Sequence, residues 1–457
     1  MDAKIPAMVF FRFKEEITYT CKMIALKMIA EEKSVQQTKF FEITAILLPI
    51  ILIVIFVNLY GLKIPYQDEW EIVGAIEKMH NHSLTTADLW AQHNEHRIFF
   101  PRIIMLFSAK FSKWNISLEL YANIIIATAI LILLLSILKS TVENTPRLLK
   151  LFTALIAFSM VQNENWAWGW QMQIFLSAFG TILAVWAANK WQGQIKGLLT
   201  VIIGAVISSY SFNSGLGTFI AVLLIFLLQN KWKLIHILIL IVVFAGAISL
   251  YYYNYRKPVL HPSLLFFADH PQLYLKYVFT CMGSSLAWNY SSAQLIAEIS
   301  IIIIVCAIIF LWKMDRSKIS MLAPWFALAL YACITALAIG IGRSGLNSRQ
   351  SMASRYTTIT LYLPLCAIIL FPYAAGLITH LNKFNKTVFM LILLSTYMLS
   401  YCKGIIEMRT RYMDTRKAAA YLSDIKAAKD EELNILFYDP NVLRTRVQIL
   451  FDMGIKF

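Results

Sequence analysis

Charged residues are scarce in this chain, and cysteines are few. Only 15% of the 457 residues are charged, whereas 59% are hydrophobic. A soluble protein of this length needs a far more polar surface, so the composition places the chain among integral membrane proteins. The six cysteines are scattered, mostly within or beside apolar segments, and fit neither a disulfide framework nor a zinc-binding pattern.

Acidic residues are outnumbered by basic ones, and the formal net charge is +15. A nucleic acid is a poor explanation for this excess, because many lysines and arginines lie in short connections between apolar segments. Basic residues in such connections orient a membrane protein and meet anionic lipid headgroups. We therefore expect membrane lipids as partners and no nucleic acid.

The distribution of apolar residues divides the chain into three parts. Residues 1–42 mix apolar and charged residues, which predicts a cytoplasmic amphipathic segment without a cleavable signal peptide. Between residues 43 and 402, apolar runs of about 20 residues predict about eleven membrane-spanning helices. The predicted spans are 43–61, 118–138, 150–162, 173–189, 197–211, 217–230, 234–252, 292–312, 320–342, 357–379 and 387–402. The expected fold is an all-α polytopic membrane protein.

Lysine-rich links between the spans orient the predicted bundle with its N-terminus in the cytoplasm. The opposite face then carries a long first loop, 62–117, and a small extracytoplasmic tail, 403–457. Within the loop, residues 98–113 are apolar but interrupted by proline, arginine and lysine, so we expect a helix along the membrane interface. The tail is charged at helical spacing and could form a small cap on the outer face.

Two groups of polar residues stand out in the first outer loop. Asp68 and Glu69 follow the first span, and the run from His93 to Arg97 lies further along the loop. A carboxylate beside the bilayer can serve as a general base. An acidic pair at the start of a helix is also an ordinary N-terminal cap. The position directly after the first span favours the catalytic interpretation.

The run His93, Glu95, His96 and Arg97 has three open interpretations. Imidazole and carboxylate groups can bind a divalent metal, although the spacing differs from that of helical zinc sites. Arg97 favours contacts to a phosphate or a sugar, because a guanidinium group forms forked hydrogen bonds to phosphate. Structural polar packing is the third interpretation.

A late outer loop holds three arginines, Arg343, Arg349 and Arg355, among glycines and serines. Arginines at a helix end can extend toward lipid phosphates. Lysine would serve equally well there, so the uniform choice of arginine favours a phosphate or pyrophosphate ligand. Arg355 with Tyr356, at the mouth of a span, is the preferred phosphate contact.

A further outer loop interleaves three tryptophans with amides and includes Trp168 and Gln171. Tryptophan anchors membrane interfaces, which explains any single residue of this kind. Aromatic faces also stack on sugar rings while amides bond sugar hydroxyls, so this loop is a candidate sugar-binding surface.

The acidic pair after the first span, the interfacial helix after His96 and Arg97, and the arginines of a late outer loop together resemble the GT-C superfamily of integral membrane glycosyltransferases. Within that group the chain is similar to bacterial enzymes that use polyprenyl-phosphate sugars, including those that glucosylate O-antigen. The resemblance implies a hexosyltransferase of the bacterial inner membrane with a periplasmic active site and a GT-C-like fold. Its donor would be a polyprenyl-phosphate sugar and its acceptor a lipid-linked glycan.

The resemblance also implies roles for individual residues. Asp68 would be the base of an inverting transfer, with Glu69 as its supporting neighbour, and the arginines, led by Arg355, would hold the phosphate. The run His93 to Arg97 would shape the sugar or acceptor site, with no cofactor assigned and a divalent metal left open there. Two other classes stay open: an O-antigen polymerase or ligase, and a lipid-linked sugar transporter. A transporter would need ionisable groups inside its spans. The predicted spans are largely apolar, and the charged residues gather in the outer loops, which favours the enzyme.

Overall fold

The computed structural model describes residues 42–258, 262–263, 265–377 and 383–455. The chain divides into two units, Met1–Pro49 and Ile50–Phe457. Of the first unit, the described part is the beginning of the helix Glu42–Tyr60, and the predicted amphipathic segment before residue 42 lies outside the described residues. The second unit holds the remaining helices and every candidate site residue.

The described residues form helices and contain no strand. In chain order after the helix Glu42–Tyr60, the elements are η1 (Gln67–Ile72), α2 (Val73–His80), α3 (Thr86–Trp90), α4 (Phe99–Ser112), α5 (Ile116–Thr141), α6 (Arg147–Ala157), η2 (Met160–Gln162), α7 (Asn163–Ala167), η3 (Gly169–Gln171), α8 (Met172–Lys190), α9 (Ile195–Ser209), η4 (Asn213–Leu216), α10 (Gly217–Leu228), α11 (Leu234–Tyr252), α12 (Phe266–Asp269), α13 (Pro271–Gly283), η5 (Ser284–Leu286), α14 (Tyr290–Met314), α15 (Ser317–Arg343), η6 (Ser348–Met352), η7 (Ser354–Tyr356), α16 (Thr357–Thr360), α17 (Tyr362–Ala374), η8 (Ala375–Leu377), α18 (Lys383–Ala419), η9 (Ala420–Asp424), α19 (Asp430–Leu433) and α20 (Pro440–Asp452).

Within the described part of the chain, seven helical segments are long and apolar enough to cross a membrane: Glu42–Tyr60, Ile116–Thr141, Gly169–Lys190, Leu234–Tyr252, Tyr290–Met314, Ser317–Arg343 and Ser354–Ala374. Two shorter apolar helices, α9 and α10, lie at predicted spans. The remaining predicted spans, 150–162 and 387–402, fall on α6 and α18. The prediction of an all-α polytopic membrane protein is confirmed, while the count of about eleven spans stays a prediction.

Small and hydroxyl-bearing residues let the central helices of the bundle approach closely. A Cβ atom on Gly180 of α8 would lie 2.4 Å from the carbonyl oxygen of Gly204 on α9, so any larger residue would force the two helices apart. Beside them, the hydroxyl oxygens of Thr181 and Thr218 are 2.7 Å apart. These buried hydroxyl groups satisfy one another and therefore add little cost to the apolar interior.

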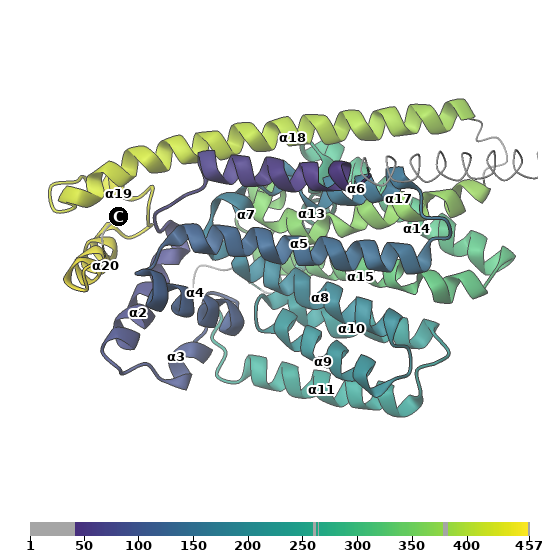
Figure 1. Cartoon of the computed structure of the whole chain (residues 1–457), viewed down its shortest axis with the longest axis horizontal. Coiled ribbons are helices and arrows are strands. Elements are labelled where there is room, and N and C mark those ends of the chain that lie inside the picture. The colour runs from purple at the N-terminus through teal and green to yellow at the C-terminus, as the bar shows by residue number, and fades with distance from the viewer. Residues whose placement is uncertain (1–41, 259–261, 264, 378–382, 456–457) are drawn as a thin grey trace, which may run out of the picture. The chain divides into compact units, whose positions relative to one another are not determined.

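The predicted first outer loop, residues 62–117, folds into short helices at one end of the bundle, where α2, α3 and α4 lie together with the C-terminal α19 and α20 (Figure 1). The helix predicted over residues 98–113 is present as α4. It exposes Phe107 and Phe111 and buries Met105 and Ala109. This division into an apolar exposed face and a packed face is typical of a helix at a membrane interface.

The C-terminal tail packs onto this loop. The tail side chains Leu433, Leu436 and Phe437 are fully buried, and they share one hydrophobic cluster with Trp70 and Val73 of the loop. The helical charge spacing of the tail is matched by helices, the longest of them after residue 430 being α20. The tail is therefore a cap on the loop that carries Asp68.

Candidate functional site

A polar cavity of about 370 Å³ opens between the first outer loop and the ends of several long helices. It gathers residues that lie far apart in the chain. Its polar and aromatic lining includes Tyr66, Gln67, Asp68, His93, Asn94, His96, Glu164, Trp168, Gln171, Gln173, Phe212, Arg343, Arg355 and Tyr356. Asp68, the histidines, the sugar-binding candidates Trp168 and Gln171, and two of the four candidate arginines thus share one space.

Asp68 lies beside His93 in the wall of the cavity. The Nε2 atom of His93 lies 3.5 Å from Oδ2 of Asp68, whose side chain is 36% exposed. Burial alone would raise the pKa of Asp68. The hydrogen bond and charge of His93, together with the charges of Arg355 and Arg343, outweigh burial and lower this pKa below its ordinary value. Asp68 is therefore ionised at neutral pH and able to accept a proton.

Glu69 turns away from the cavity and is fully buried. Its Oε2 atom accepts a hydrogen bond from the backbone N–H of Tyr66, at 3.1 Å. Burial and the neighbouring carboxylate of Glu119 raise the pKa of Glu69 well above its ordinary value, so its environment favours the neutral acid. The two adjacent acids thus have opposite environments. Because Glu69 accepts from the backbone N–H of Tyr66, the alternative interpretation as a helix cap applies to Glu69.

Arg355 is held by Glu164 at the mouth of a span. Its Nη1 atom lies 2.9 Å from Oε1 of Glu164. Burial would raise the pKa of Glu164, but the charges of Arg355 and of Arg411 on α18 outweigh burial and keep this pKa below its ordinary value. The short helix α7 fixes the backbone as well, because Nδ2 of Asn165 donates to the carbonyl oxygen of Arg355 at 3.0 Å.

Arg343 forms a second ion pair, with Glu95, at 2.5 Å. Glu95 also lies 3.5 Å from Nε2 of His96, while Nδ1 of His96 accepts a hydrogen bond from the backbone N–H of Asn213 at 3.2 Å. Burial, only partly offset by the charge of Glu95, lowers the pKa of His96 to about 4. His96 is therefore a neutral ring at physiological pH, fixed by its neighbours and stacked on Phe212 with 4.2 Å between ring centroids.

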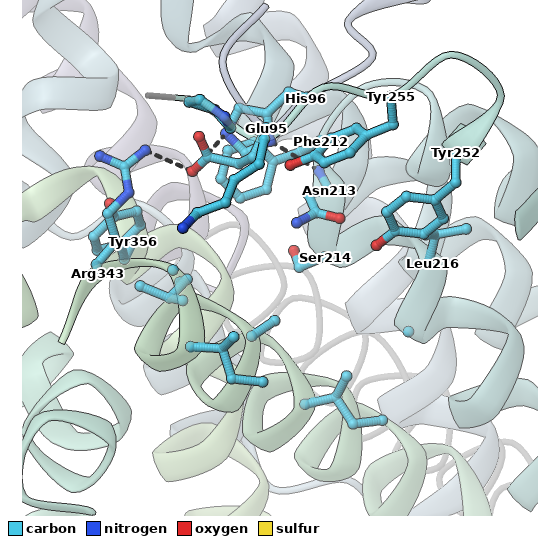
Figure 2. A pocket seen from close by; sticks show the side chains of 18 of the residues that line it. Glu95, His96, Phe212, Asn213, Ser214, Leu216, Tyr252, Tyr255, Arg343 and Tyr356 are labelled. Carbon is cyan, nitrogen blue, oxygen red and sulfur yellow. Dashed lines mark hydrogen bonds and ion pairs between the residues drawn. The ribbon is translucent and has the colours of Figure 1, made fainter. Parts of the chain in front are cut away.

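A second cavity, of about 340 Å³, adjoins the polar one, and Figure 2 shows side chains that line it. It shares His96, Phe212, Arg343 and Tyr356 with the polar cavity. The rest of its lining is mostly apolar and comes mainly from η4, α10, α11, the loop that follows α11, and α15; it includes Leu216, Ile220, Phe244, Ile334, Ala338 and Ile339. The paired Glu95 and Arg343 thus stand where a polar space meets an apolar one.

Two predicted arginines lie elsewhere. The guanidinium group of Arg97 donates to the backbone carbonyls of Trp90, Tyr251 and Tyr253, at 2.9, 3.1 and 2.5 Å. Arg97 thus fastens the first loop to the end of α11. Arg349 is exposed in η6. Within the described part of the chain, neither residue lines the two cavities.

A metal site is not formed by the described residues, among which no group of three or more histidine, cysteine or acidic side chains could hold an ion. A metal was an open interpretation for the run His93 to Arg97, but side chains of this run contact other side chains of the protein. His93 faces Asp68, and Glu95 faces Arg343. These candidate metal-ligating side chains therefore interact with other side chains of the protein.

Three residues near the site were not predicted from the sequence. Arg411, in the tail half of α18, donates to Oδ1 of Asn163 at 2.7 Å, and no local pattern marks it. Glu119 lies in a predicted span, and a lone acid in an apolar run was a usable signal. Gln67, the third residue, lines the polar cavity and has a left-handed backbone conformation.

Comparisons of the chain with protein-family models, with curated proteins and with solved structures give no match. A functional assignment therefore depends on the chemistry of the two cavities.

Proposed function

We propose that the protein is a GT-C-type glycosyltransferase that moves a hexose from a polyprenyl-phosphate donor to a lipid-linked glycan such as O-antigen. It would act at the periplasmic face of a bacterial inner membrane. The observation that carries the proposal is the meeting of the two cavities. An ionised Asp68 and Arg355 lie in the polar cavity, the apolar cavity adjoins it, and Arg343 lines both.

The donor has three chemically different parts, and the two cavities offer a place for each. A phosphate suits the space beside Arg343 and Arg355, because guanidinium groups form strong paired hydrogen bonds to phosphate oxygens. The polyprenyl chain suits the apolar cavity, and the sugar suits the polar one, where Trp168 offers an aromatic face and Gln171 an amide. The arginines would also stabilise the charge that develops on the leaving phosphate.

The reaction is a single displacement. One carboxylate oxygen of Asp68 takes the proton of an acceptor hydroxyl while the hydroxyl oxygen forms a bond to the anomeric carbon. The bond from that carbon to the phosphate oxygen breaks, and the electron pair leaves with polyprenyl phosphate. Attack opposite the leaving group inverts the anomeric configuration. His93 would orient Asp68 and help keep it ionised until the proton arrives.

Replacement of Asp68 by Asn tests the proposal. The purified full chain in lipid vesicles would be given a radiolabelled polyprenyl-phosphate hexose and a lipid-linked glycan, and sugar transfer would be measured. We expect Asp68→Asn to lower the transfer rate by about 10²- to 10⁴-fold, the usual contribution of a general base. Asp269→Asn, in an exposed outer-loop position, is the matched control and should transfer normally. Transfer by Asp68→Asn at the wild-type rate would remove Asp68 as the base.

The donor is tested separately by a panel of polyprenyl-phosphate hexoses. Transfer from one of them would identify the sugar. If the wild-type protein transfers sugar from none of them but uses a polyprenyl-diphosphate glycan, the proposal fails in favour of a polymerase or ligase.

A further inference from the structure

Gln67, the residue directly before Asp68, has a left-handed backbone conformation with φ of 47°. A residue with a Cβ atom adopts this region at a cost, because Cβ crowds the following carbonyl oxygen. Such conformations persist only where the surrounding structure fixes them, and they cluster at functional sites. Gln67 itself lines the polar cavity.

The C-terminal tail is what fixes Gln67. Its backbone N–H donates to the carbonyl oxygen of Leu436 at 2.6 Å, and its side-chain Nε2 donates to the carbonyl oxygen of Ile435 at 2.8 Å. Both carbonyls belong to the turn between α19 and α20. Gln67 is therefore bound through backbone and side chain to a segment 368 positions away.

The tail segment is itself firmly seated. Leu436 and Phe437 are fully buried against the first loop. On the neighbouring helix, Nη2 of Arg446 lies 2.9 Å from Oε2 of Glu71 in the loop. A buried apolar contact and an ion pair thus hold the two carbonyls at fixed positions relative to η1.

We propose that Gln67 is a positioning residue for Asp68, and that the C-terminal tail is the element that sets it. The left-handed turn at Gln67 directs the next side chain into the cavity, toward His93. On the other side of Asp68, Glu69 is tied to the backbone of Tyr66. Asp68 is thus presented between two anchored neighbours. The catalytic part of this inference rests on the proposed function, whereas the mechanical part does not.

The backbone requirement is tested by two substitutions at one position. Gln67→Gly keeps the N–H bond to Leu436 and adopts the left-handed region without cost, whereas Gln67→Ala keeps that bond but retains the Cβ atom. We expect the hydrogen-exchange rate of residues 66–72 and the kcat of Gln67→Gly to remain closer to the wild-type values than those of Gln67→Ala. A position with an ordinary backbone gives the opposite order, because glycine costs more chain entropy.

The seat of the tail is tested by Arg446→Ala. Gln448→Ala is its matched control, since Gln448 lies on the same helix, is exposed and bonds within α20, to Asp452. The first readout is hydrogen exchange of the peptide covering residues 66–72 in the purified full chain, which needs no activity. We expect exchange about 10-fold faster in Gln67→Ala and Arg446→Ala and unchanged in Gln448→Ala.

The second readout is catalysis. We expect Gln67→Ala to lower kcat about 10- to 100-fold with little change in KM for the donor, because a small displacement of the base slows the chemical step. The acid limb of the pH profile should move to higher pH as Asp68 loses the influence of His93.

The outcomes separate the two proposals. Faster exchange of 66–72 in these variants, with a wild type that transfers no sugar, overturns the proposed function and supports the mechanical role of the tail. Unchanged exchange in both Gln67→Ala and Arg446→Ala overturns the inference. Faster exchange with unchanged kcat and pH profile in an active protein also overturns it, because the tail is then a structural support only.

Discussion

The carboxyl groups of Glu69 and Glu119 meet beside Gly169, although Glu69 lies on the loop 62–117 and Glu119 on α5: a Cβ atom on Gly169 would lie 2.8 Å from an oxygen of each. Both residues are buried, with 0% and 1% of their surface exposed. Two ionised carboxylates in such a buried site repel each other, so the site favours a neutral acid on at least one of them. A proton on one acid would then hydrogen-bond the loop of the candidate active site to the bundle.

Glu69→Gln should make the stability of the protein less dependent on pH. The pKa of Glu69 is raised above its ordinary 4.5 in the folded state, so the folded state holds more protons than the unfolded one above that pH. Stability is then full below pH 4.5 and falls as pH rises through the raised pKa. An amide supplies its own hydrogen atom and does not titrate. Thermal unfolding from about pH 5 to pH 9 measures this, with the exposed Glu431→Gln as control. Parallel pH profiles for the wild type and Glu69→Gln would contradict it.

Gly169→Ala should destabilise the protein by about 1–3 kcal/mol, as overpacking does. A Cβ atom there would lie 2.8 Å from Oε1 of Glu69 and 2.8 Å from Oε2 of Glu119, between the two carboxyl groups. Gly246→Ala on α11 is the control, because a Cβ atom at that position meets nothing within 4 Å. The control should be neutral or slightly stabilising. Unfolding by heat in detergent compares the two, and an equal effect of both substitutions would remove the steric explanation.

Arg355→Lys should weaken the binding of polyprenyl phosphate about 10-fold. A lysine keeps the charge but loses the planar fork that grips two phosphate oxygens, and its reach to Glu164 changes as well. Arg349→Lys, in the same loop but exposed, should bind as the wild type does. Equilibrium binding of a short-chain polyprenyl phosphate measures both. Equal losses in the two variants would indicate a general effect of loop charge.

His93→Gln should move the loss of transfer activity to higher pH. In the wild type His93 and two arginines depress the pKa of Asp68, so the base stays ionised until the pH falls through that lowered value. Without the imidazole the pKa rises, and protonation disables the base at a higher pH. The acid limb of kcat/KM against pH shows the shift. An acid limb at the same pH in the wild type and in His93→Gln would mean that His93 does not control the ionisation of Asp68.

Ala338→Phe should discriminate between donors by chain length. Ala338 lines the apolar cavity, so a ring there takes up space that a long polyprenyl chain would occupy. We expect a KM about 10-fold higher for long-chain donors, with less effect on short ones. Leu337→Phe, at the exposed neighbouring position, is the control. An equal effect on long and short donors would place the lipid chain elsewhere.

The sequence predicts the membrane class and part of the site because both depend on local composition. Apolar runs predict spans, and polar runs between them mark loops, so Asp68, His93 and Arg355 could be assigned to one face from the sequence. The separation of Arg97 from Arg343 could not, because identical side chains differ only in what the fold places beside them. One meets backbone carbonyls and the other a carboxylate at the cavity.

The rest of the site depends on contacts between distant segments. Arg411 meets Asn163 across 248 positions, and nothing in the local sequence around either residue encodes that distance. The left-handed backbone at Gln67 has no marker in residue type, since glycine or asparagine would be the usual choice. Here tertiary contacts decide the conformation over local preference.

The bonds from Gln67 to the turn before α20 also bear on biosynthesis. A ribosome makes the first outer loop long before it makes Ile435, and at roughly 5–20 residues per second the interval is tens of seconds. In the proposed topology Asp68 crosses to its side of the membrane during that time, while the carbonyls that orient it do not yet exist. A nascent chain therefore carries the acid without its alignment. If the tail positions Asp68 as proposed, that alignment is complete only when the turn before α20 has bound to the first loop.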